Sequence, residues 1–109
     1  MNIFMDRVDF YSSAGPHWFG QKLADAFLRQ NCRVTGMGEN LNHVDVQLSF
    51  VQASIRLLDV PLFQRLDGIW YNSETDYKKM NEPIKETYQI ADGVIFQSEF
   101  NKRLTHKYF

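Results

Sequence analysis

The order in which extended and helical patterns follow one another is the feature that most constrains the fold of this chain. The clearest strand pattern covers residues 44–50, where apolar and polar residues alternate with the two-residue period of a half-buried strand. A helical pattern precedes it, because apolar residues from Phe19 to Phe27 fall on one helix face. Along the chain the patterns run strand, helix, strand, strand, helix, strand, helix. Strands that alternate with helices predict a parallel sheet with helices packed on its faces.

Weaker patterns predict the other elements. These are a strand over residues 3–10, a short extended piece over 31–34, a short helix over 54–59, a strand over 62–66, a helix that begins at 81–83 and ends at 92–93, a strand over 94–96 and a last helix capped by Ser98. Residues 69–71 either continue the strand before them or begin a loop. Asn81 is a good helix cap and Pro83 is tolerated in a first turn. The wholly apolar strand 94–96 is expected to be covered on both faces.

Composition argues against several classes of protein. The 109 residues suffice for one domain with one core, and 44% of them are hydrophobic, as in folded globular chains. Twelve basic and thirteen acidic residues give a net charge of −1, which argues against a dedicated nucleic-acid binder. No apolar run approaches the roughly 18 residues that cross a bilayer, and the first residues lack a secretory-signal pattern. A single cysteine, Cys32, fits a reducing cytoplasm.

Ligands of a parallel sheet bind beyond the carboxyl ends of the strands, and that rule selects three places in this sequence. The first place opens the first helix, and its candidate substrate-binding residues are Gly15, Pro16, His17, Phe19 and Gly20. Free N–H groups at a helix start favour anions such as phosphate, and glycine lets a ligand approach the backbone closely. The segment has neither the Walker spacing nor the dinucleotide-binding spacing, so an ordinary turn is the simpler interpretation of this loop taken alone.

The second place is residues 65–68, at the end of a predicted strand. Arg65 would clamp a phosphate or carboxylate through its planar guanidinium, and Asp67 would orient a hydroxyl or act as a general base. The alternative is a structural ion pair between these two side chains. The third place holds Ser98 and Glu99, whose simplest interpretation is a helix cap followed by a first-turn acid that suits the helix dipole.

Two other kinds of site have no support in the sequence. His17, His43 and His106 are scattered without metal-ligand spacing, and Cys32 adds no cluster, so we expect no zinc site. No Gly-x-Ser-x-Gly elbow is present, so a hydrolase triad is not expected either.

Four segments share a pattern that goes beyond their secondary structure. They are Asp9-Phe10 followed by Gly15-Pro16-x-x-Phe19-Gly20, then Val46-x-Leu48-Ser49-Phe50, residues 61–69 and, most specifically, residues 91–101 with the sequence ADGVIFQSEFN. Together they resemble bacterial family 4-type glycosyltransferases of the kind that build cell-surface polysaccharide. The similarity runs along nearly the whole chain.

The resemblance implies a GT-B fold, in which two Rossmann-like domains face each other across a cleft. The N-terminal domain mainly holds the acceptor and the C-terminal domain mainly holds the nucleotide-sugar donor. Residues 1–109 would then be a Rossmann-like, acceptor-side N-terminal domain, incomplete in length, with helices on both faces of its sheet. Such enzymes commonly need no metal or other cofactor beyond the nucleotide-sugar co-substrate, and peripheral membrane contact is common among them.

The resemblance also implies roles for the candidate residues. Residues 15–20 would face the interdomain cleft, and Arg65 and Asp67 would lie at a cleft-facing strand end. Asp67 is the catalytic candidate, although many relatives place a histidine in about that region. Ser98 would cap the helix at the cleft edge, with Glu99 beside it.

A site formed between two domains cannot be assembled from one of them, so we expect this chain alone not to transfer sugar. The donor half would come from a C-terminal domain or from a separate chain. The helical pattern continues to Phe109, which predicts a fragment of a longer protein, with a frayed natural helix as the alternative. Two other functions remain open: a non-catalytic binding or assembly module, and a remnant without activity of its own.

Overall fold

A computed structural model describes residues 1–12, 15–71, 74 and 76–109, although of Gly15 and Pro16 it describes only the backbone. Parts of the predicted loop 11–17 and of the polar stretch 72–80 therefore lie outside the described residues. The helices and strands are β1 (Asn2–Asp6), α1 (Gly15–Arg29), β2 (Arg33–Thr35), β3 (Val46–Phe50), β4 (Leu62–Leu66), α2 (Tyr77–Ile90), β5 (Gly93–Phe96) and α3 (Glu99–Tyr108).

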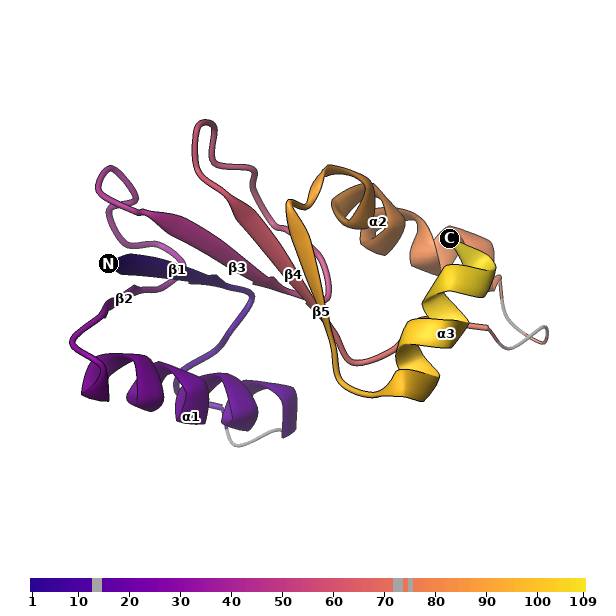
Figure 1. Cartoon of the computed structure of the whole chain (residues 1–109), viewed down its shortest axis with the longest axis horizontal. Coiled ribbons are helices and arrows are strands. Elements are labelled where there is room, and N and C mark those ends of the chain that lie inside the picture. Colours follow the sequence, from indigo (N-terminus) through magenta and orange to yellow (C-terminus); the bar gives the residue numbers. More distant parts are fainter. Residues whose placement is uncertain (13–14, 72–73, 75) are drawn as a thin grey trace.

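The five strands form one parallel sheet in the order β2-β1-β3-β4-β5. The chain runs outward from β1 in one direction to β2 and then in the other direction through β3 to β5. Since crossovers between parallel strands are right-handed, this reversal places the helices on opposite faces. Figure 1 shows α1 on one side of the sheet and α2 and α3 on the other. The predicted Rossmann-like α/β fold, with helices on both faces, is confirmed.

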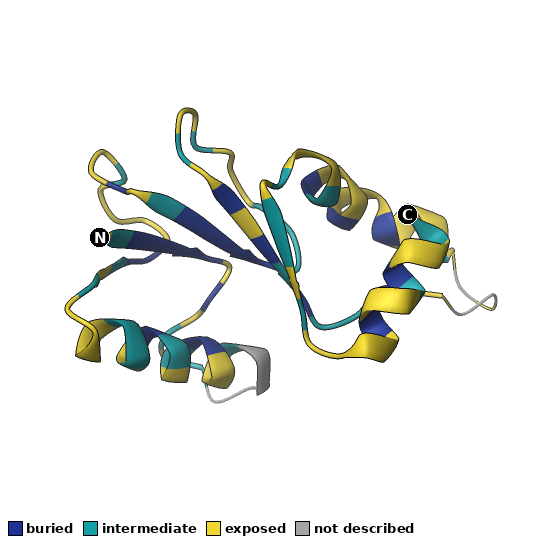
Figure 2. Ribbon diagram, in the orientation of Figure 1, coloured by how far each residue is buried: buried dark blue, intermediate teal, exposed yellow. Residues whose placement is uncertain are grey.

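The face under α1 is the main apolar core. Ile3 and Met5 of β1 pack there with Leu48 and Phe50 of β3, and the register Met5↔Leu48 sets these side chains on the same face. Ala24 of α1 closes this cluster. Figure 2 shows the central strands buried while the outer surfaces of the helices are exposed.

The opposite face of β1 and β3 carries buried polar side chains beside the buried Phe4. Asp6, Gln47 and Ser49 are each 0% exposed, because the β3–β4 loop lies across them instead of a helix. A second apolar cluster forms farther along this face, where Leu66 of β4 meets Ile69 and Ile84. Aromatic and aliphatic side chains of α2, β5 and α3 pack around that cluster.

Two of the predicted elements differ from the structure in extent or are absent. The strand over 3–10 ends at Asp6, and Arg7 directly after it adopts a left-handed backbone with φ of 67°. The helix over 54–59 is absent, because hydrogen bonds to β1 and β3 hold that segment as bends. Residues 69–71 form a loop, which was one of the two interpretations.

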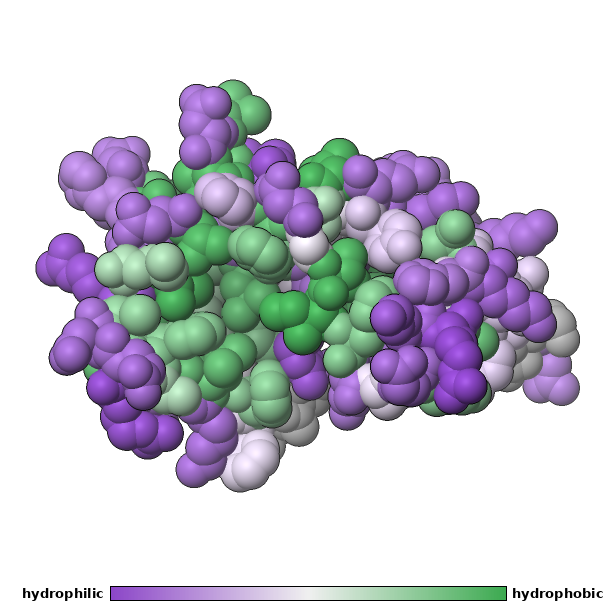
Figure 3. Space-filling view, viewed as in Figure 1, coloured by the Kyte–Doolittle hydropathy of each residue, from purple (hydrophilic) through white to green (hydrophobic). Residues whose placement is uncertain are grey.

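The start of α2 and the environment of β5 were also predicted wrongly. Helix α2 begins at Tyr77 with Asp76 as its cap, so Pro83 lies inside the helix and Asn81 serves another contact. Strand β5 is an edge strand, which leaves Ile95 50% exposed rather than covered on both faces. Figure 3 shows hydrophobic surface gathered over the sheet, whereas the outer side of the α2 and α3 region is largely hydrophilic.

Candidate functional site

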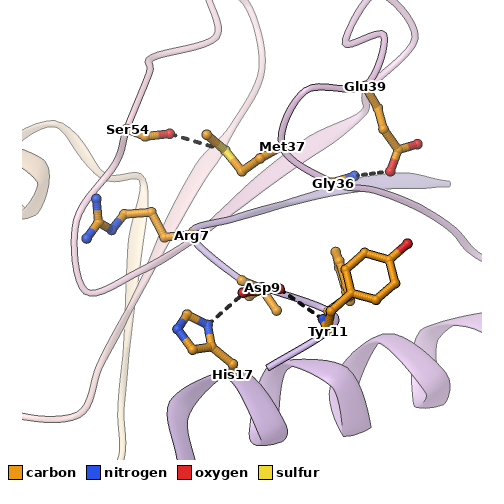
Figure 4. Close-up of a pocket in the computed structure, with 10 residues that line it drawn as sticks. Arg7, Asp9, Tyr11, His17, Gly36, Met37, Glu39 and Ser54 are labelled. Atoms are coloured by element: carbon orange, nitrogen blue, oxygen red, sulfur yellow. Dashed lines mark hydrogen bonds between the residues drawn. The ribbon is translucent and has the colours of Figure 1, made fainter. Parts of the chain in front are cut away.

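The sheet reverses its direction of winding between β1 and β3, and a cavity lies outside the carboxyl ends of the strands beside this point. Its volume is about 880 Å³. Figure 4 shows that the residues lining it come from the β1–α1, β2–β3 and β3–β4 loops and the start of α1. The residues lining this crevice are Arg7, Val8, Asp9, Phe10, Tyr11, His17, Gly36, Met37, Glu39 and Ser54.

Side chains of α1 hold the β1–α1 loop in place. The backbone N–H of Asp9 donates to His17 Nδ1 at 3.0 Å, and the N–H of Tyr11 donates to Asp9 Oδ1 at 2.9 Å. Gln21 Nε2 donates to the carbonyl oxygens of Asp9 at 3.0 Å and Ser12 at 2.6 Å. Because Nδ1 accepts, the neutral His17 ring carries its proton on Nε2. His17, a predicted substrate-binding residue, therefore also fixes the backbone of the β1–α1 loop.

The charged groups of the crevice come from different loops. Glu39 accepts a hydrogen bond from the N–H of Gly36 at 2.9 Å, which fixes the carboxylate at the end of β2. Arg7 is exposed, and its guanidinium makes no hydrogen bond or ion pair within the described part of the chain. Its left-handed backbone is uncommon for a residue with a side chain and carries a cost. The crevice can therefore offer a free cation, a carboxylate acceptor and the hydroxyl of Ser54 to a ligand.

The β3–β4 loop forms one wall of the crevice, and the buried carboxylate of Asp6 holds this loop in place. The carboxylate accepts hydrogen bonds from Ser49 Oγ at 2.9 Å, from Gln47 Nε2 at 3.3 Å and from both the N–H and the hydroxyl of Ser54. All these donors are neutral, and they compensate for the burial of the carboxylate. Gln47 Nε2 also donates to the carbonyl oxygen of Ile55 in the β3–β4 loop, at 2.7 Å.

Val51 is the first residue of the β3–β4 loop, and its φ of 72° is a strained conformation for a β-branched residue. Its N–H donates to the carbonyl of Arg65 at 2.8 Å and its carbonyl accepts from Gln64 Nε2 at 2.7 Å. Arg7 and Val51, the residues directly after β1 and β3, are thus both held in the left-handed region. Strain at the ends of the two strands that flank a crevice is a common feature of functional sites.

A second group of predicted residues meets on the face of the sheet under α1. Arg65 forms an ion pair with Asp67, and its guanidinium carbon lies 4.0 Å from the centre of the Phe19 ring. The Phe50 ring lies on the same guanidinium at 5.6 Å. The Arg65 side chain is only 11% exposed, so the cation is largely occupied by the protein itself. The structural ion pair that the sequence left open as an alternative is present.

The remaining predicted residues have local structural contacts. Ser98 Oγ accepts from the N–H of Asn101 at 3.1 Å and caps α3, as predicted, and Glu99 follows it in the exposed first turn. A Cβ at Gly20 would lie 2.7 Å from Val8 Cγ1, so this glycine allows α1 to pack close to the end of β1. Gly15 and Pro16 belong to the backbone of α1, and the Pro16 ring lies outside the described part of the structure.

Of the predicted site residues whose side chains the structure describes, only His17 lines the crevice. Phe19, Arg65 and Asp67 form a separate group, and Ser98 and Glu99 lie at the end of β5. Sequence reasoning missed the crevice residues Arg7, Glu39 and Ser54, together with Asp6 beneath them. One signal was available for Asp6, since an acid directly after an apolar strand stands at the carboxyl end where sites form.

The fold and the crevice together define a Rossmann-like α/β domain with a potential ligand site at the reversal point of its sheet. Comparison with protein-family models, with curated proteins and with solved structures finds no match for the chain. Within the described residues, no helix is long and apolar enough to cross a membrane. The same residues contain no group of three or more His, Cys, Asp or Glu side chains placed to hold a metal ion.

Proposed function

We propose that this chain is the acceptor-side segment of a glycosyltransferase, and that it binds a hydroxyl-bearing acceptor in the crevice. The observation that carries the proposal is the position of the cavity beside the reversal point of a parallel sheet. Its lining suits a sugar or another polyol, since carboxylates accept hydrogen bonds from hydroxyls while Arg7 and His17 Nε2–H donate them. The sequence resemblance described above names the reaction class.

The proposal includes a division of labour between two domains. The acceptor hydroxyl would be held here, and the nucleotide-sugar donor would be held by a C-terminal domain or a separate chain. Asp67 remains the candidate base, for an acceptor whose reacting hydroxyl extends from the crevice toward the end of β4, and Arg65 would keep its carboxylate oriented through the ion pair. A cytoplasmic site of action and peripheral contact with a membrane surface belong to the same proposal.

A second function, a non-catalytic binding or assembly module, is favoured by one observation. The Asp67 carboxylate is engaged by Arg65, and Phe19 and Phe50 cover that cation. A carboxylate held in this way orients Arg65, whose guanidinium packs on Phe19 and so joins α1 to β4. If the crevice binds sugars but Asp67→Asn leaves transfer by the complete two-domain assembly unchanged, the binding-module interpretation replaces the catalytic role of Asp67.

Amide NMR spectra of the isotopically labelled chain test the binding proposal directly. Titration with methyl glycosides of glucose, mannose and N-acetylglucosamine should shift the amide signals of Arg7, Asp9, Gly36 and Ser54 for at least one of these probes. Arg7→Ala should weaken this binding about tenfold, because it removes a charged donor from the site. Arg33→Ala is the matched control, since Arg33 is exposed at the amino end of β2, away from the crevice.

Two results would count against the proposal. Amide shifts that cluster away from the crevice, or that are absent up to high probe concentration, would remove its binding half. Saturable transfer by the purified chain alone, from UDP-glucose, UDP-N-acetylglucosamine or GDP-mannose, would refute the expectation that a second domain is needed.

A further inference from the structure

The β3–β4 loop, residues 51–61, carries one wall of the crevice and is also bonded to helix α2, none of whose residues lines the crevice. The N–H of Ala53 donates to Thr87 Oγ1 of α2 at 2.9 Å. The next residue, Ser54, lines the crevice and donates its N–H to Asp6 of β1 at 2.8 Å. Two consecutive N–H groups of the loop are therefore held by different elements, one beneath the crevice and one in α2.

The Thr87 hydroxyl is fixed in the orientation that its bond to the loop needs. Thr87 is buried, and its Oγ1 donates to the carbonyl oxygen of Pro83, one helical turn earlier, at 3.1 Å. Because the hydroxyl proton is used within the helix, the lone pairs of Oγ1 remain for the Ala53 N–H. Thr87 thus gives α2 a buried acceptor that is aimed at the β3–β4 loop.

Gln64 of β4 forms a second link between the same loop and the same helix. Its side chain is 0% exposed, and Nε2 donates to the carbonyl of Val51 at 2.7 Å and to the carbonyl of Ile84 in α2 at 3.0 Å. Its Oε1 is a buried atom without a hydrogen-bond partner among the described residues. A buried acceptor that stays unpaired is destabilising, so the favourable contribution of Gln64 lies in the two donated bonds that join Val51 to α2.

On its crevice side, the segment held in this way meets the β2–β3 loop. Ser54 Oγ lies 3.4 Å from Met37 Sδ, and the same hydroxyl donates to Asp6 (Figure 4). Ser54 therefore stands where two walls of the crevice meet. A displacement of the neighbouring Ala53 would change the position of this hydroxyl relative to both walls.

We infer that Thr87 is a positioning residue of the crevice and that Gln64 supports it. Through Ala53 and Val51 these two side chains set where Ser54 presents its hydroxyl, so the position of α2 sets the affinity for a ligand held in the crevice. The inference rests on the proposed function only in treating the crevice as the ligand site. Neither Thr87 nor Gln64 lines the crevice, so their effect passes through the backbone of the loop.

Three variants separate this role from a general contribution to stability. Thr87→Val keeps the shape of the side chain and removes the acceptor of the Ala53 N–H, whereas Thr87→Ser keeps the hydroxyl. Thr105→Val is the matched control. Thr105 is a buried threonine of α3 whose Oγ1 donates to the carbonyl of Asn101 one turn earlier at 2.9 Å, but no hydrogen bond joins it to the β3–β4 loop.

Amide hydrogen exchange measured by NMR reports the position of the loop without any ligand. In Thr87→Val, the amides of Ala53 and Ser54 should exchange about tenfold faster or more, relative to core amides of β1 and β3, because the loop opens locally. In Thr87→Ser and Thr105→Val, this ratio should stay within about twofold of wild type, since any global loss of stability affects the core amides equally.

Titration with the methyl glycoside that binds the wild-type crevice gives the second measurement. Thr87→Val should weaken its binding about fivefold, because only the fraction of molecules with the loop in place is competent to bind. Thr87→Ser should restore the affinity, and Thr105→Val should leave it unchanged. Gln64→Met, which removes both donated bonds, should weaken binding in the same direction and keeps the inference testable if Thr87→Val does not fold.

Several results would overturn the inference. One is an Ala53 amide that is already unprotected in the wild-type protein, or whose exchange Thr87→Val leaves unchanged. Another is faster loop exchange in Thr87→Val with unchanged glycoside affinity, and a third is an equal effect of Thr105→Val on the loop. If no methyl glycoside binds the wild-type chain, the crevice proposal fails, while the exchange of Ala53 and Ser54 still decides whether α2 positions the loop.

Discussion

Removal of the Asp6 carboxylate should be one of the most damaging single changes to the β3–β4 loop. In Asp6→Ala, the partly buried N–H of Ser54 loses its acceptor, whereas Gln47 Nε2 keeps the Ser49 hydroxyl and the Ile55 carbonyl as acceptors. Each buried donor left unpaired costs about 1–3 kcal/mol, and the hydroxyls of Ser49 and Ser54 can turn to other partners. The unpaired Ser54 N–H, together with the hydrogen bonds that the two hydroxyls lose, therefore predicts a total loss of about 2–4 kcal/mol.

Asp6→Asn should cost much less, for a geometric reason. Ser49, Gln47 and the Ser54 N–H all donate to Oδ2, whereas only the Ser54 hydroxyl donates to Oδ1. An Asn side chain can place its oxygen at the Oδ2 position and its amide nitrogen at the Oδ1 position, where the Ser54 hydroxyl can accept. The contacts then survive without the charge, so we expect a loss of about 1–2 kcal/mol.

Urea unfolding followed by circular dichroism measures both losses. The free energies of unfolding should fall in the order wild type, Asp6→Asn, Asp6→Ala, with unchanged dependence on urea. A conservative control is Ser54→Ala, which removes only the hydroxyl and keeps the N–H bond. An Asp6→Ala variant within about 1 kcal/mol of wild type, or an Asn variant as unstable as the Ala variant, would refute this account of the network.

Three further predictions follow from local geometry. Gly20→Ala should lower stability by about 1–3 kcal/mol in the same unfolding assay, because its Cβ would lie 2.7 Å from Val8; an unchanged midpoint would contradict the close packing. Arg7→Gly should raise stability by about 1 kcal/mol, since glycine adopts a φ of 67° without strain, while it weakens glycoside binding in the crevice; a less stable variant would show that the backbone there is not strained. Ile95→Lys should reduce any concentration-dependent association seen by analytical ultracentrifugation, because a charge on an edge strand opposes pairing with another chain; equal association of both proteins would exclude β5 as the contact.

Several features followed from the sequence because they depend on near neighbours along the chain. The alternation over residues 44–50 located β3, since a two-residue period needs only one buried face. Ser98 capped α3 as predicted, because its hydroxyl bonds the N–H three residues later. The cap predicted for α2 was wrong, because Asn81 contacts a residue that is distant along the chain. Asn81 has the right chemistry for a cap, but its partner is Trp70, eleven residues away, and Asp76 caps the helix instead.

The candidate site was harder to predict, because its residues are distant from one another along the chain. Arg7, Glu39 and Ser54 come from three loops and meet only because β1, β2 and β3 end at the same edge of the sheet. Arg65 and Asp67 lie two residues apart, so their ion pair was foreseeable as an alternative. The cover that Phe19 gives to Arg65 was not, because it depends on how α1 crosses the sheet.

The sequence by itself determined the class of fold, because hydrophobic periodicity and the alternation of strand with helix are local properties that leave few arrangements for a chain of this length. Tertiary structure decided which polar groups are buried and which are presented to a ligand. Asp6 and Asp9 are both acids within the stretch predicted as the first strand, yet one lies beneath the β3–β4 loop and the other lines the crevice. That difference arises from the loop that packs over β1 and β3, and its position depends on hydrogen bonds that span more than forty residues.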